Sequence, residues 1–227
     1  MNLGLTVRSG QRIVLALALL LSMLLTAIPA QADDTGALTV DTPYVTYGQR
    51  VTITGKGFAP GEIILIWVTL STSDGKPAGE AVQVITNVKG EFLKYQPDNL
   101  IQVMTTPGVY YVTVEGTTSK IRAVGSVTLL APTLQADANV NSNGTVALTF
   151  KGANFYVGEN IALWVTDANG KVYDLGYVFA NQDSTMPAPP KDTAIWVVRG
   201  ATLPLVLSAY GNTSQQTVIT TLSPTPL

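Results

Sequence analysis

The feature that most limits the fold of this chain is an internal repeat. Residues 54–69 (TGKGFAPGEIILIWVT) match residues 151–166 (KGANFYVGENIALWVT), about 97 positions later. The identical pairs include Gly61/Gly158, Glu62/Glu159 and Trp67/Trp164. A period of this length is too long for a solenoid repeat and fits one small domain. The sequence therefore predicts two tandem modules of related structure.

A second match supports the duplication and helps to set the module boundaries. Residues 116–119 read GTTS, and residues 211–214 read GNTS. We expect module one to span residues 33–130 and module two residues 131–222. A Pro/Thr tail, residues 223–227, follows them.

Both modules have the pattern of β-structure. Gly and Pro interrupt the chain every ten residues or so, with runs rich in Thr, Val, Ile and Tyr between them, which is typical of a β-sandwich. Residues 63–68 are continuously apolar, as in a central strand that is buried on both sides. The fold class predicted is all-β: two tandem immunoglobulin-like antiparallel β-sandwiches after a cleaved signal peptide.

About seven strands are expected in each module. In module one they fall near residues 37–40, 50–54, 63–70, 81–86, 91–96, 109–115 and 120–129; the fifth strand of module two is expected at residues 194–199. The dipeptides Asp74-Gly75 and Asn169-Gly170 predict type I′ hairpin turns, which need positive φ at both central residues.

The first 32 residues have the features of a secretory signal peptide. Arg8 and Arg12 stand close to an apolar run, residues 13–25, and an A-Q-A site ends at Ala32. We therefore expect cleavage after Ala32 and a secreted or cell-surface location. No other long apolar run follows, so no membrane span is expected after signal removal.

Charge and composition exclude several classes of function. Without Arg8 and Arg12 the formal charge is −4 (11 − 15), and no basic cluster that could bind nucleic acid is present. The chain has no Cys and no His, which removes disulfides, thiolate or histidine zinc sites and the common nucleophilic triads. We therefore expect a non-enzymatic protein that needs no cofactor or metal and is stabilised by packing alone.

Three short motifs in module one resemble bacterial extracellular Ig-like repeat domains. Residues 57–62 (GFAPGE) resemble a "GFxPGE" turn, residues 107–116 (PGVYYVTVEG) a "PGxYxVxxxG" strand, and residues 86–92 (TNVKGEF) a "TDxxGxF" hairpin. Module two keeps part of the first motif, FYVGE at residues 155–159, and no clear copy of the others. The resemblance implies a surface or secreted location and a spacer, adhesive or binding role, and it names no ligand.

The residues shared by the two modules are interpreted as structural. Trp67 and Trp164 stand in apolar strands and are expected to fill the core, with an aromatic sugar platform as the alternative. Glu62 and Glu159 lie in different modules, so a turn role is preferred to a catalytic carboxylate pair. The segment DANGK, residues 167–171, is read as a hairpin turn rather than a calcium loop.

The candidate binding surface lies in module two, where the repeat does not dictate the sequence. A Pro-rich loop, residues 183–192, precedes the predicted fifth strand. Its candidate contact residues are Met186, Pro187, Pro189, Pro190 and Trp196. The alternative is a long loop packed on its own sandwich.

Three functions follow as hypotheses. The leading one is an exported cell-surface or envelope protein that acts as an adhesive, spacer or structural subunit. Its partners would be an envelope polymer, other surface proteins or further copies of itself. The alternatives are a soluble carbohydrate- or protein-binding module that uses the Pro-rich loop, and a self-assembling filament subunit joined through sheet edges.

Overall fold

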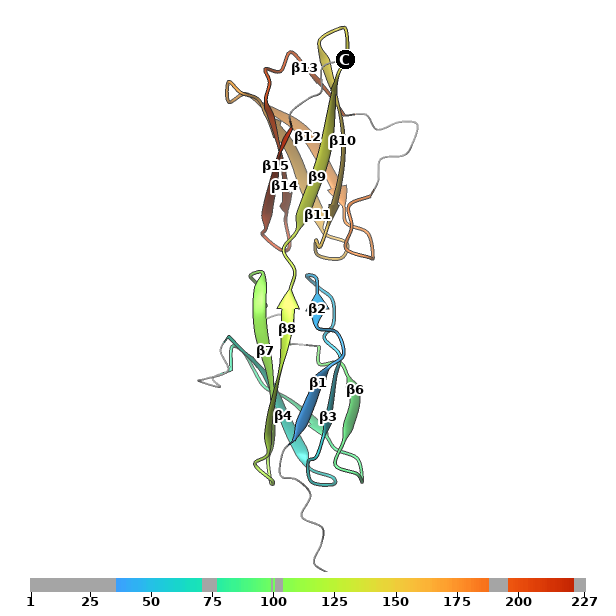
Figure 1. Cartoon of the computed structure of the whole chain (residues 1–227), viewed down its shortest axis with the longest axis vertical. Helices are drawn as coiled ribbons and strands as arrows, with labels where there is room; N and C mark the ends of the chain where they lie inside the picture. Colours follow the sequence, from blue (N-terminus) through green and yellow to red (C-terminus); the bar gives the residue numbers. More distant parts are fainter. Residues whose placement is uncertain (1–35, 71–76, 99, 101–103, 188–195, 223–227) are drawn as a thin grey trace, which may run out of the picture. The chain divides into compact units, whose positions relative to one another are not determined.

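The computed structural model describes residues 36–70, 77–98, 100, 104–187 and 196–222. The predicted signal peptide, the turn at residues 74–75 and the C-terminal tail lie outside these residues. The described chain consists of strands, turns and loops, and its strands form two successive groups along the sequence (Figure 1). The predicted all-β fold is confirmed.

Module one contains two sheets, ordered β1-β3-β6 and β2-β8-β7-β4-β5. Its strands are β1 (Ala37–Val40), β2 (Tyr44–Val45), β3 (Ile53–Lys56), β4 (Ile63–Thr69), β5 (Val82–Ile85), β6 (Phe92–Tyr95), β7 (Gly108–Gly116) and β8 (Arg122–Leu129). The pairings are antiparallel except that the short β2, which the sequence did not predict, runs parallel to β8.

Module two repeats this arrangement, without a counterpart of β2 among its described strands, in sheets ordered β13-β10-β9 and β12-β11-β14-β15. Its strands are β9 (Thr133–Val140), β10 (Thr145–Ala153), β11 (Asn160–Thr166), β12 (Val172–Phe179), β13 (Trp196–Arg199), β14 (Leu205–Gly211) and β15 (Thr217–Leu222). In both modules the repeated apolar strand, β4 or β11, lies inside the larger sheet with a partner on each side.

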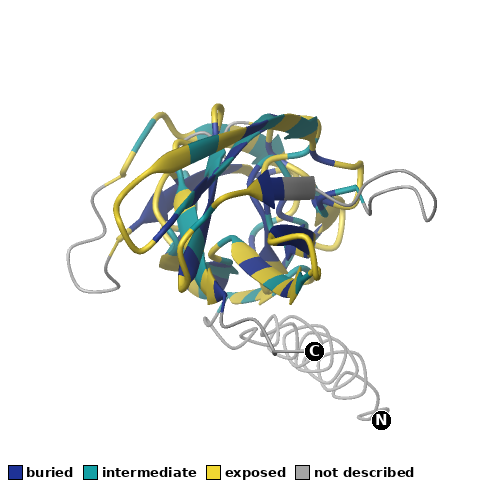
Figure 2. Ribbon diagram, turned by 90° about the horizontal axis from the view of Figure 1, so that it is seen from above, coloured by how far each residue is buried: buried dark blue, intermediate teal, exposed yellow. Residues whose placement is uncertain are grey.

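Each module has its own hydrophobic core. The first core draws its residues from Val45 to Leu129 and the second from Leu134 to Leu222, with none shared. Figure 2 shows buried and exposed segments alternating along the strands. This alternation follows from the two-residue period of a strand, in which successive side chains point to opposite faces. Packing of separate cores is what stabilises two sandwiches that contain no cysteine.

Two local predictions differ from the structure. The second strand was expected at residues 50–54, but β3 begins at Ile53 because the Thr52 amide donates to Thr42 Oγ1. A type I′ turn was expected at Asn169-Gly170, yet only Gly170 has positive φ there. Gly170 N donates to Asp167 O and Asp167 N to Lys171 O, which makes a three-residue hairpin loop with glycine in the left-handed position.

Candidate functional site

The repeated glutamates are buried braces in both modules. Glu62 is 5% exposed, and its carboxylate accepts hydrogen bonds from the amides of Ala59, Thr118 and Ser119 and from Ser119 Oγ. It thereby ties the turn before β4 to the turn between β7 and β8. The short GTTS motif is the other half of this brace.

Glu159 makes the same four contacts in module two. Glu159 is 3% exposed, and its carboxylate accepts from the amides of Tyr156, Thr213 and Ser214 and from Ser214 Oγ. The GNTS motif supplies the donors, as GTTS does in module one. The preferred turn role of the two glutamates is therefore the one the structure assigns.

The brace also explains the glycine that opens each motif. A Cβ at Gly116 would lie 2.4 Å from Ser119 Oγ and 2.6 Å from Glu62 Oε2. At Gly211 it would lie 2.4 Å from Ser214 Oγ and 2.6 Å from Glu159 Oε1. Only a residue without a side chain leaves room for the buried carboxylate.

The environment of Glu62 favours its charged form. Burial by itself disfavours the carboxylate, but the hydrogen bonds from Ser119, Ala59 and Thr118 outweigh burial and hold the pKa of Glu62 below its ordinary value. A carboxylate saturated in this way is a poor proton acceptor for catalysis, because its lone pairs are already used.

Asp167 has a similar role at one end of module two. Its carboxylate accepts from the amides of Asn169, Lys171 and Thr202 and from the Tyr173 hydroxyl. Burial opposes ionisation here as well, and these bonds, led by the one from Thr202, keep the pKa of Asp167 below its ordinary value. The hairpin-turn reading therefore explains this segment, since the oxygens that calcium would need are used by backbone amides.

Of the candidate contact residues of the Pro-rich loop, Met186 does not lie on an exposed surface. Met186 is only 4% exposed and belongs to the core of module two. Pro187 is half-buried, and Trp196 begins β13. Pro189 and Pro190 lie outside the described residues, as does the side chain of Trp196.

Met186 is buried because it is the counterpart of Phe92 in module one. Phe92 packs over Gly55, where an added Cβ would lie 2.1 Å from the Phe92 ring. Met186 packs over the equivalent Gly152, where a Cβ would lie 2.3 Å from its sulfur. The Met186 amide also donates to Gly152 O over 2.9 Å. A methionine in this position fills the space that a phenylalanine fills in the other module.

A hairpin turn leads into each of these side chains; residues 86–92 predicted the one in module one, and its copy in module two was missed. In module one, Asn87 N donates to Glu91 O and Gly90 N donates to Asn87 O. In module two, Asn181 N donates to Thr185 O and Ser184 N donates to Asn181 O. Gly90 and Ser184 occupy the same left-handed position, with φ of 71° and 64°. The copy is invisible in sequence because Ser replaces Gly and Met replaces Phe.

The two repeated tryptophans lie on the outer faces of the larger sheets. In β11 the core residues are Ile161, Leu163 and Val165, so alternation places Trp164 on the opposite face, where it is half-buried. The expectation that Trp164 fills the core is therefore wrong. Trp67 is buried at 6% exposure as expected, but on the outer side of β4, where the Arg122 guanidinium stacks 5.7 Å from its ring centre.

Trp164 is part of an aromatic outer face in module two. Strand register places Tyr177 and Tyr210 opposite Ala162 on either side, and Phe179 opposite Asn160. Tyr177 and Phe179 are 62% and 59% exposed, with ring centres 5.8 Å apart and planes at 82°. We call Trp164, Tyr177, Phe179 and Tyr210 the aromatic face.

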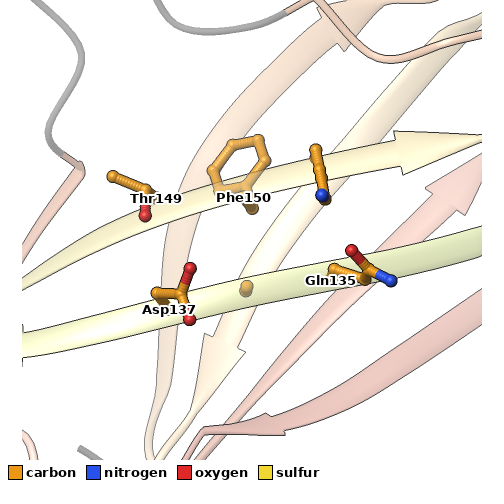
Figure 3. A pocket seen from close by; sticks show the side chains of 6 residues that line it. Gln135, Asp137, Thr149 and Phe150 are labelled. Atoms are coloured by element: carbon orange, nitrogen blue, oxygen red, sulfur yellow. The ribbon is translucent and has the colours of Figure 1, made fainter.

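A shallow hollow lies on the other sheet of module two. It measures about 440 Å³ and is lined by β9 and β10. In Figure 3, Gln135 and Asp137 come from one strand, and Thr149 and Phe150 from the other. Its polar rim could bind a small polar molecule, but no buried charged side chain or nucleophile lines it.

A family model identifies the domain family of the two sandwiches. The model of the macroglobulin-like domain matches residues 31–129 and again residues 133–223. The chain belongs to the macroglobulin-like domain family. The two matches coincide with the two cores and the two braces, so each module is one macroglobulin-like domain. The finer resemblance to "GFxPGE" repeats remains a prediction.

Solved structures give weaker likenesses to these macroglobulin-like modules. A tetra-tandem repeat from the extending region of a large adhesion protein is 16% identical over 84% of this chain, with a TM-score of 0.34. Trypsin-activated α-2-macroglobulin from Escherichia coli is 11% identical over 84% of this chain, with a TM-score of 0.26. The chain spans 50% of the first structure and 16% of the second. A search of curated proteins finds no relative.

Within the part of the chain that the structure describes, no three His, Cys, Asp or Glu side chains gather in a way that could hold a metal ion. None of the described segments forms a helix with the length and apolar character needed to cross a membrane.

Proposed function

We propose that the chain is an exported, non-enzymatic protein that works at the cell envelope through the surfaces of its macroglobulin-like modules. It would act there as an adhesive, spacer or structural subunit. An envelope polymer, other surface proteins or further copies of the chain would be its partners. The signal-peptide pattern of residues 1–32 and the family match support an extracytoplasmic location.

The observation that carries the proposal is the role of the repeated glutamates. Glu62 and Glu159 are the acidic residues that both modules share in the matched segment, and each is sealed by four hydrogen bonds within its own module. The acidic residue that both modules have kept therefore has a structural role, because it stabilises the fold of its own module. The apolar side chains left in solvent, such as Tyr177 and Phe179, are suited to contact rather than chemistry.

Co-sedimentation with washed cell envelopes tests this proposal. The purified protein is centrifuged with envelopes and, in parallel, alone. Pelleting only with envelopes is expected, and the bound component can then be identified by extracting the envelopes stepwise. Protein that stays in the supernatant in both tubes would contradict the envelope role.

The tube without envelopes also distinguishes envelope binding from self-assembly. Protein that pellets without envelopes would favour a filament subunit. The remaining alternative, a soluble module that binds through the Pro-rich loop, predicts that Trp196→Ala abolishes ligand binding while the fold is retained.

A further inference from the structure

The larger sheet of each module presents its outer face with the same strand order, so the two faces can be compared position by position. In module one the face carries Gln83, Glu115 and Arg122, aligned across the sheet with Leu65. In module two the equivalent positions carry Tyr177, Tyr210 and Thr217, aligned with Ala162. One face has lost its charges at these positions and gained aromatic rings.

The surroundings of the two repeated tryptophans also differ between the faces. Trp67 is covered by the Arg122 guanidinium, so module one shields its ring with its own side chain. Thr217 stands in the place of Arg122 and is too short to cover Trp164 in the same way. In module two the half-buried Trp164 lies opposite Asp174 of the neighbouring strand, and Tyr177 lies opposite Ala162, two residues before Trp164.

The composition of the aromatic face indicates the chemistry of its ligand. Among the strand residues that the structure describes on this face, Asp174 is the only charged one. Without a basic group, the face does not complement a polyanion. Its polar side chains are mostly hydroxyls, among them Thr166, Thr217 and Thr221. Protein interfaces share the enrichment in Tyr, Trp and Phe, but they are also enriched in Arg and Met and depleted in Ser.

Aromatic rings flanked by hydroxyls suit a sugar ring. A pyranose has an apolar C–H face that packs on an aromatic ring and a rim of hydroxyls that form hydrogen bonds. Tyr177 and Phe179 meet at 82°, which provides one ring face and one ring edge rather than a flat platform. This corner fits a single glycan chain better than the flat surface of a crystalline polysaccharide.

We propose that the aromatic face of module two binds a neutral glycan chain, with Tyr177 and Phe179 as its main contacts. The inference rests on the envelope function proposed above and deepens it, because it assigns the envelope polymer a chemical class and a place on the protein. The module-one face is the built-in control, since it has the same strands without the aromatic pair.

Titration of the purified protein with soluble neutral oligosaccharides tests the inference. The probes are the hexamers of β-1,4-glucose, β-1,3-glucose, β-1,4-N-acetylglucosamine and α-1,4-glucose, with polygalacturonate as the anionic comparison. We expect one or more neutral hexamers to bind and polygalacturonate not to bind. Tyr177→Ala or Phe179→Ala should weaken binding about ten-fold, as loss of a stacking ring implies. Gln83→Ala and Ile85→Ala at the matched positions of module one should leave binding unchanged.

Three results would overturn the inference. These are no binding of any neutral hexamer, equal loss in the module-one variants, or a concentration-dependent dimer that Tyr177→Ala abolishes, which would make a second copy the occupant. Because Tyr177 and Phe179 are exposed, the variants should fold, and circular dichroism checks this. If envelopes still retain the protein while no neutral hexamer binds, the glycan inference fails and the envelope role stands.

Discussion

The two modules agree where a carboxylate holds a turn and differ where side chains face outward. Glu62 and Glu159 make the same set of contacts, within the segments that the two modules share. On the outer faces, by contrast, Gln83 and Glu115 of one module correspond to Tyr177 and Tyr210 of the other. The duplication has thus kept its internal brace and changed its surface.

The largest effect is expected from removing the brace. Glu62→Ala leaves buried amides without an acceptor, so we expect the free energy of unfolding of module one to fall by about 3 kcal/mol. Glu159→Ala should destabilise module two by a similar amount. Urea unfolding followed by tryptophan fluorescence measures both, because each module contains tryptophan.

A carboxylate outside the brace serves as the control. Glu91 lies 3.8 Å from Lys56 and accepts no buried amide through its side chain among the described contacts. Glu91→Ala should cost less than about 1 kcal/mol, as is typical of a surface pair. Equal losses for Glu62→Ala and Glu91→Ala would show that the hydrogen bonds of Glu62 contribute little to the stability of module one. The shared brace would then not explain why both modules keep the glutamate.

The next effect compares the side chains packed over equivalent glycines. Gly55→Ala pushes against the rigid ring of Phe92, whereas Gly152→Ala pushes against the flexible Met186 and, at 2.8 Å, against the ring of Phe155. We expect a loss of about 2–3 kcal/mol in the first case and a smaller loss of about 1–2 kcal/mol in the second, because the nearest neighbour of Gly152 can move. Thermal unfolding of the two variants measures the difference.

A double variant isolates the cause. In Gly152→Ala/Met186→Ala the methyl group no longer meets the sulfur, so the two changes should cost less together than the sum of the single changes. Strict additivity would mean that Met186 is not the neighbour that must move.

The fold was predictable because its signals are local or repeated. Alternation, turn residues and the duplicated segment identified the two sandwiches and nearly all of their described strands. The exceptions depend on tertiary pairing. Strand β2 is only Tyr44–Val45, and it exists because it pairs with β8, which is more than 80 residues away in sequence.

The candidate site was less predictable, since an apolar run does not reveal which face it buries. Residues 63–68 and the strand around Trp164 are apolar on both sides, so the outer position of the tryptophans could not be read from them. Met186 looked like a loop residue because Ser184 replaces the glycine of the hairpin motif. Knowledge of that turn would have aligned Met186 with Phe92 and predicted its burial.

A smaller effect concerns pH. Because the pKa of Glu62 is lowered in the folded chain, its contribution is complete above the unfolded value of about 4.3 and is lost as pH falls through the folded pKa. Thermal midpoints measured from pH 6 downward should therefore fall more steeply for the wild-type protein than for Glu62→Gln. Parallel curves would mean that the charge of Glu62 does not contribute to the brace.

The smallest effect tests a part of the brace that only module one has. Thr86 Oγ1 donates to Ala59 O over 2.7 Å and accepts from Glu62 N over 2.9 Å, whereas Ala180 occupies the equivalent position in module two. Thr86→Ala should cost about 1 kcal/mol, the usual net value of such bonds. Ala180→Thr should stabilise module two by about 0.5 kcal/mol if the hydroxyl finds the same partners. Because both variants change the same pair of turns, opposite signs in urea unfolding would establish that the modules share this geometry. Destabilisation in both would show that module two has closed the space that the threonine needs.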